Sequence, residues 1–246
     1  MPRRALIFLP ALLLVAAALA PAAPGDDIDE AAAGKQVSQL LEKTPGTDPR
    51  AIWALSESLA KGGKPAIRPL ADAVESVEST RRLAIGRALL LLEDYVRGLT
   101  TLRQVAEDED ATPDLRAAAV GLIGDEGELE DAEWLEDKID TTLEPRVKMA
   151  MAKALWNLNF TSKKKGKDVL LAYMRSTDDD LRAEGALALG EIGAAGEARS
   201  ALVELSREPS ERGRSAAFLL DVLKLEQLRE RDLRTPRDTD TPIEPV

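Results

Sequence analysis

The amino-acid sequence predicts an all-α protein, an α-solenoid of about six helix pairs preceded by a signal peptide. Three observations carry this prediction. A pattern recurs every 30–34 residues from Asp48 to about Arg231. Equivalent positions in the copies carry small or aliphatic residues, at spacings that fall on one face of a helix. No segment shows the alternation of polar and apolar residues that marks a half-buried strand.

Residues 1–22 are typical of a secretory signal peptide. Arg3 and Arg4 give a positive start, an apolar run extends over residues 5–20, and small residues provide a cleavage site after Ala22. The apolar run is shorter than the roughly 20 residues of a membrane-spanning helix. We therefore expect an exported protein, periplasmic or extracellular, with no stable membrane span after cleavage. Retention of the segment as an uncleaved anchor is the alternative.

The remaining chain divides into three predicted parts. Residues 23–45 form an N-terminal capping helix and linker, with the helix over 26–43. Residues 46–233 form the solenoid, and residues 234–246 form a disordered C-terminal tail. The tail is rich in proline and poor in large apolar residues, so it lacks the means to bury a core.

The register of the repeat is set by one residue before each apolar run. These anchor residues are Asp48, Arg82, Arg116, Lys148, Arg182 and Arg212. The position seven residues after each anchor is always aliphatic: Leu55, Leu89, Ile123, Leu155, Leu189 and Leu219. The positions three and six residues after each anchor are mostly small or apolar, which lets a neighbouring helix approach closely. The pattern predicts the first helix of each pair.

A second amphipathic helix is expected after a break in each copy. In the first repeat its apolar stripe is Ile67, Leu70 and Val74, and in the sixth it is Leu225 and Leu228. Proline residues precede or open several first helices, as at Pro113 and Pro145, where the missing N–H costs little.

The stretch Leu181–Gly193 resembles the short bacterial-type repeat of the HEAT-repeat family. It reads as an aliphatic residue and Arg, several small residues, and then Leu-Gly-x-Ile-Gly. Residues 115–124 are similar, and so are residues 147–155, where Trp156 replaces the usual glycine. The resemblance extends over about 185 of the 246 residues. It implies a right-handed solenoid and says little about chemistry, because such arrays serve many unrelated partners.

Composition excludes several classes of protein. The chain has no cysteine and no histidine, so it has no disulfide, no thiolate or imidazole metal site and no histidine-activated nucleophile. Its formal charge of −11 disfavours nucleic-acid binding. Two S-x-x-K matches, at Ser58 and Ser162, lack the companion motifs of penicillin-binding enzymes. The acidic clusters lack the spacing of a calcium-binding loop. We therefore expect no catalytic residue, no metal and no cofactor.

The expected function is a non-enzymatic protein-binding or scaffold module. In such arrays the second helices line a concave surface, and we expect it to bind another protein. The candidate binding residues on this surface are Arg68, Asp72, Arg97, Thr101, Gln104, Glu130, Glu133, Trp134 and Asp137. The third repeat presents acidic residues there, and Trp134 is a candidate interface anchor.

Several interpretations remain open from the sequence. Trp53 and Trp156 fit packing between repeats better than ligand stacking. The basic run over residues 163–167 is interpreted as a solvated loop between the two helices of the fourth repeat, or as a contact for an anionic partner. The alternative functions are an enzyme or enzyme subunit of the lyase-like HEAT type, and a regulatory spacer within a larger envelope assembly. A catalytic cleft would gather groups with perturbed pKa values in one pocket.

Overall fold

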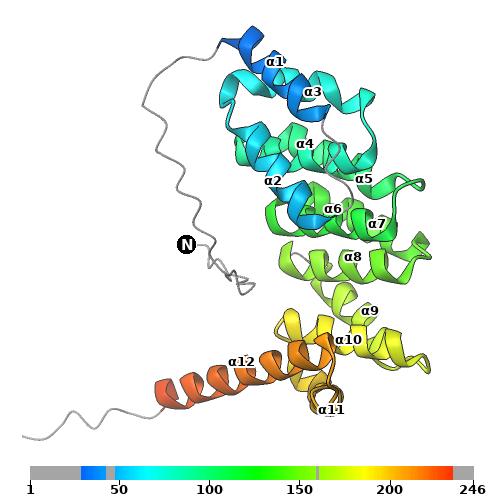
Figure 1. Cartoon of the computed structure of the whole chain (residues 1–246). Coiled ribbons are helices and arrows are strands. Elements are labelled where there is room, and N and C mark those ends of the chain that lie inside the picture. The colour runs from blue at the N-terminus through cyan, green and yellow to red at the C-terminus, as the bar shows by residue number, and fades with distance from the viewer. Residues whose placement is uncertain (1–28, 43–47, 159–160, 235–246) are drawn as a thin grey trace, which may run out of the picture.

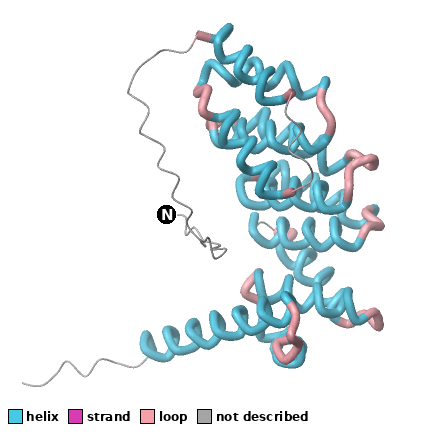
Figure 2. The backbone as a smooth tube through the Cα atoms, viewed as in Figure 1, coloured by secondary structure: helices cyan, strands magenta, loops and turns pink. Residues whose placement is uncertain are grey.

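The computed structural model describes residues 29–42, 48–158 and 161–234, and all regular structure within these ranges is helical (Figure 1 and Figure 2). The predicted signal peptide, and the predicted tail from residue 235 onward, lie outside the described residues. The all-α prediction is confirmed for the part of the chain that is described.

Twelve α-helices and two short 3-10 helices make up the described fold. The helix that precedes the repeats is α1 (Glu30–Leu41). The first helices of successive repeats are α2 (Pro49–Ala60), α4 (Ser79–Leu91), α6 (Pro113–Glu126), α8 (Pro145–Leu158), α10 (Asp179–Glu191) and α12 (Glu211–Arg234). The second helices are α3 (Ile67–Ala73), α5 (Tyr95–Glu107), α7 (Leu129–Thr141), α9 (Lys163–Met174) and α11 (Ala195–Leu205). The 3-10 helices, Lys64–Ala66 and Val74–Ser76, flank α3.

The helix pairs stack one after another along the molecule (Figure 1). Each first helix packs against the first helix of the next repeat, from α2 through α12. The second helices form another layer, which we call the second-helix layer, and α1 extends it by packing on α3. This arrangement is the predicted solenoid. Loops at one edge join α3 to α4, α5 to α6, α7 to α8 and α9 to α10 (Figure 2).

The predicted sixth helix pair is wrong. Helix α12 runs without a break through Leu225 and Leu228, which were expected in a separate second helix. No glycine or proline lies between Gly213 and the end of α12, so nothing in this segment interrupts the backbone hydrogen bonds. The described solenoid therefore has five helix pairs and ends in one long helix.

The predicted register is confirmed in the core. The aliphatic residue seven positions after the anchor is buried in the first five repeats, and Leu219 is partly buried in the sixth. Six positions after the anchor, Ala88, Ala154 and Ala188 are buried. The residues at this position in the first and last repeats, Ala54 and Phe218, are exposed, Phe218 by 62 %. End helices of a stack have fewer neighbours to cover these positions.

Two of the anchor arginines, Arg82 and Arg116, bind backbone carbonyls where the preceding second-helix segment ends. Arg82 donates from Nε to the carbonyl of Val74 at 3.2 Å and from Nη2 to that of Val77 at 3.0 Å. Arg116 donates from Nε to the carbonyl of Ala106 at 3.0 Å. The last carbonyls of a helix have no partner within it and carry partial negative charge. The arginine of the repeat signature therefore joins two repeats by capping the end of a helix.

Candidate functional site

Negative charge is concentrated in the middle of the chain. Residues 107–144 contain fifteen Asp or Glu and two Lys or Arg, a net charge of −13, whereas the whole chain carries −11. All other residues together therefore carry +2. This segment comprises the end of α5, the α5–α6 loop, helices α6 and α7 and the loops at both ends of α7. A charge imbalance of this size produces a local field that attracts cationic partners.

Many charges in the second-helix layer are already paired between neighbouring helices. Lys138 of α7 binds Glu107 of α5, with Nζ and Oε1 2.7 Å apart. Lys165 of α9 binds Asp140 of α7, also at 2.7 Å. Two further pairs join α1 to α3 and α9 to α11: Glu30–Arg68 and Glu197–Lys167. These side chains hold adjacent repeats together.

The basic run of the fourth repeat belongs to this system of pairs. The structure places it in the first turns of α9, so its predicted position in a loop is wrong. The Lys163 ammonium lies 4.0 Å from the centre of the Trp156 ring. Lys165 and Lys167 bind Asp140 and Glu197. Three of its four lysines thus have contacts within the fold.

Four of the predicted binding residues also make contacts within the chain. Arg68 is exposed and lies 3.5 Å from Glu30, with Asp72 3.9 Å away on its own helix. Arg97 binds Asp94 at 2.6 Å. Gln104 donates from Nε2 to Glu75 at 3.1 Å. These contacts occupy part of the polar capacity of the four side chains, and Gln104 Oε1 is buried without a hydrogen-bond partner among the described residues.

The expectation that Thr101 lies on the surface is wrong. Its side chain is 4 % exposed, and its hydroxyl donates to the carbonyl of Arg97 at 2.8 Å. Helix α5 packs against both α4 and α6, so its buried arc is wider than a single apolar stripe and includes Thr101 beside Leu102. A threonine that bonds to its own helix can be buried without an unsatisfied hydroxyl.

The predicted acidic residues of α7 differ from the other candidates. Glu130, Glu133 and Asp137 are exposed, and no ion pair or side-chain hydrogen bond within the described residues engages their carboxylates. Glu130 and Asp137 lie four residues before and three residues after Trp134, so all three side chains share one side of α7. We call Glu130, Glu133 and Asp137 the free acidic face of α7.

Trp134 is half-buried and held in a fixed setting. Its indole Nε1 donates to Glu107 at 3.1 Å, and the Arg103 guanidinium lies 5.8 Å from the ring centre. Glu107 also binds Lys138, and this hydrogen bond, followed by that from Trp134, holds the pKa of the Glu107 carboxyl below its usual range. The tryptophan is therefore positioned by contacts at its edge and over its ring.

A hollow of about 570 Å³ lies beside Trp134. Sequence reasoning identified Trp134 but missed most of its lining: Glu107, Glu109, Arg116, Lys138, Leu143, Glu144 and Met151. Glu109 and Glu144 lie in the α5–α6 and α7–α8 loops, outside the helical stripes that the sequence reveals. Leu143 is 92 % exposed, the most exposed of the large apolar residues in the described chain. We call this feature the Trp134 hollow.

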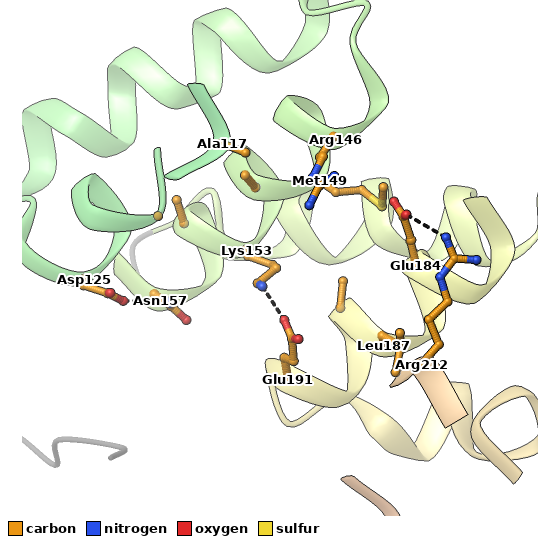
Figure 3. A pocket seen from close by; sticks show the side chains of 14 residues that line it. Ala117, Asp125, Arg146, Met149, Lys153, Asn157, Glu184, Leu187, Glu191 and Arg212 are labelled. Carbon is orange, nitrogen blue, oxygen red and sulfur yellow. Dashed lines mark hydrogen bonds and ion pairs between the residues drawn. The ribbon is translucent and has the colours of Figure 1, made fainter. Parts of the chain in front are cut away.

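A second hollow of about 570 Å³ opens between α8 and α10 (Figure 3). Lys153 and Glu191 form an ion pair across it, and Arg212 binds Glu184 at 3.3 Å. Burial raises the pKa of the Asp125 carboxyl, against the opposing effects of Asn157 and Lys153. The hydrogen bond from Arg212 to Asp180 raises the pKa of Arg212. Asp125 and Arg212 lie at opposite ends of the hollow, so the shifted groups are not gathered in one place.

The described residues contain no group of three or more Asp or Glu side chains arranged to hold a metal ion. Among the same residues, no helix has the length and apolar character needed to cross a membrane.

One family model matches the sequence. The model describes HEAT repeats and matches residues 132–220, which extend from within α7 into α12. Residues 132–220 therefore contain HEAT repeats. The matched HEAT segment includes the stretch that carries the clearest signature, Leu181–Gly193, and it begins inside the acidic segment at α7. Searches among curated proteins and among solved structures return no match. HEAT repeats commonly mediate protein interactions, which agrees with the predicted binding role at that general level.

Proposed function

We propose that this HEAT-repeat protein is an exported, non-enzymatic binding or scaffold module whose partner is a protein with a positively charged surface. The partner docks on the second-helix layer at α7. The free acidic face of α7 carries this proposal. Glu130, Glu133 and Asp137 are exposed and have no charged partner among the described residues, and they lie beside a half-buried tryptophan in a segment of net charge −13.

The charge arrangement supports binding over a purely structural role. Neighbouring second helices are joined by paired charges, as in Lys138–Glu107 and Lys165–Asp140. The free acidic face contributes no such pair within the described chain, and like charges at this density repel one another. A cationic partner relieves that repulsion. It also approaches faster, because long-range attraction raises the association rate.

Sequence and geometry support the remaining parts of the proposal. The signal-peptide pattern of residues 1–22 supports export. The absence of His and Cys from the whole chain, and the scattering of groups with shifted pKa values, favour a binding role over catalysis. A negative surface repels the phosphate backbone, which disfavours nucleic acid as the partner.

Charge reversal at the free acidic face tests the proposal. The triple variant Glu130→Lys, Glu133→Lys and Asp137→Lys is compared with the wild type in affinity capture from the native extract, at low and moderate salt. The matched control reverses three exposed acids outside residues 107–144: Glu42→Lys, Glu204→Lys and Asp221→Lys. We expect wild type and control to retain the same partner, the triple variant to lose it, and salt to weaken capture. Equal capture by all three proteins would contradict the proposal.

A further inference from the structure

We infer that the Trp134 hollow receives an arginine side chain from the cationic partner. This inference rests on the proposed function and adds the chemistry of the residue that anchors the partner. It concerns the hollow between the α5–α6 and α7–α8 loops, next to the free acidic face.

Two carboxylates in the lining have capacity for a new cation. Glu109 is exposed and makes no ion pair or side-chain hydrogen bond within the described residues. Glu144 accepts a 3.3 Å hydrogen bond from the backbone N–H of Arg146 and forms no ion pair there. The third carboxylate, that of Glu107, is already bound to Lys138 and Trp134. Glu109 and Glu144 come from the α5–α6 and α7–α8 loops, so together they present acceptors from two separate segments.

The two cations in the lining do not fill this capacity. Lys138 binds Glu107 at 2.7 Å. Arg116 directs its Nε to the carbonyl of Ala106, where it caps the end of α5. With three carboxylates and two cations, the lining keeps a net charge of −1 inside a segment of net charge −13. The field and the local charge both favour one more positive group.

The apolar part of the lining suits the stem of a long cationic side chain. Leu143 is 92 % exposed, so nothing in the described fold covers it, and Trp134 lies in the same hollow. Long cationic side chains pack their methylene groups on apolar surfaces while the charged head group remains in polar surroundings. Arginine fits better than lysine because its planar guanidinium carries five donors, can bridge two carboxylates and can lie against an aromatic ring.

Three labelled nonapeptides test the inference directly. Each has four lysines on either side of the central residue, which is Arg, Lys or Ala. Affinities for the full chain are measured by fluorescence anisotropy at low salt. We expect the Arg peptide to bind about tenfold more tightly than the Ala peptide, as a charge-assisted hydrogen bond allows, and more tightly than the Lys peptide.

Three variants locate the effect. Glu109→Gln with Glu144→Gln should remove the preference for Arg over Ala, whereas Glu42→Gln with Glu204→Gln changes the net charge equally and should retain it. Leu143→Ala, which changes no charge, should reduce the Arg preference about threefold through lost stem contact. All four substituted acids are exposed or in loops, so the variants should fold as the wild type does, which circular dichroism verifies.

The outcomes separate the two proposals. If the three peptides bind the wild type equally and with strong salt dependence, the arginine inference is wrong, whereas the proposal of a cationic partner is retained. If the two double variants lose the Arg preference to the same extent, a general field acts and the hollow is not the site. If no peptide binds and charge reversal at Glu130, Glu133 and Asp137 leaves partner capture unchanged, the proposed function itself fails.

Discussion

Arg103 of α5 holds Asp131 of α7 through one buried carboxylate. Nε and Nη2 of Arg103 lie 2.8 and 2.6 Å from Oδ1 of Asp131. The other oxygen, Oδ2, accepts the backbone N–H of Glu128 at 2.9 Å, and the Asp131 side chain is 3 % exposed. One residue therefore caps the start of α7 and joins α7 to the preceding repeat. Asp131 is the single buried acid of α7, and its contacts position the free acidic face on the other side of the helix.

Asp131→Ala should destabilise the protein by about 2–4 kcal/mol, because it removes a helix cap and leaves a partly buried guanidinium without its partner. Urea denaturation followed by circular dichroism measures this loss. The control, Asp137→Ala on the exposed side of the same helix, should change stability by less than about 0.5 kcal/mol. Equal effects of the two variants would show that the Arg103 contact does not hold α7.

Close packing of α6 on α8 depends on Gly124. A Cβ placed there would lie 2.6 Å from Cα of Ala154, a backbone atom that cannot move without shifting the helix. Gly124→Ala should therefore destabilise the protein by about 1–3 kcal/mol through overpacking. Gly121→Ala on the same helix is the control, since its added Cβ meets no atom within 4 Å. That variant should be neutral or more stable by up to about 1 kcal/mol, as alanine favours helix. Thermal melting distinguishes the two, and a tolerated Gly124→Ala would contradict this packing.

The anchor arginines should contribute to stability through their helix-capping bonds. Arg82→Met keeps most of the apolar stem and removes the donors to the carbonyls of Val74 and Val77, so we expect a loss of about 1–2 kcal/mol. Arg50→Met changes an exposed arginine of α2 whose side chain has no hydrogen bond or ion pair within the described chain. It should be near neutral in the same urea titration. A neutral Arg82→Met would show that the regular spacing of the anchors reflects helix formation alone.

Glu107 should make stability depend on pH. Its folded-state pKa is lowered, chiefly by the hydrogen bond from Lys138, so the ionised carboxylate stabilises the fold above its unfolded pKa. This contribution is lost as the pH falls through the lowered folded pKa. Glu107→Gln should therefore lower the urea midpoint at neutral pH and have a much smaller effect near pH 3. A difference between the two proteins that stays constant from neutral pH to pH 3 would contradict the Lys138–Glu107 contact.

The sequence alone determined the first five helix pairs and their register. Leu155 and Leu189 were placed in the core by spacing from their anchors, and both are fully buried, because helical periodicity selects the buried face whatever the neighbour is. The acidic character of α7 was also visible, since Glu130, Glu133 and Asp137 lie outside its apolar stripe. The same reasoning erred at Thr101, where two neighbouring helices widen the buried face of α5.

Only the tertiary structure decided which charges remain free. Pairs such as Arg103–Asp131 and Lys165–Asp140 join residues 28 and 25 positions apart, on different helices, and no local pattern reveals them. The Trp134 hollow likewise brings Glu109 and Glu144 together from two loops whose separation in space is set by the stacking of repeats. The periodicity of the sequence determines which face of a single helix is buried. Which charges are neutralised, and what shape a hollow has, depend instead on which helices become neighbours.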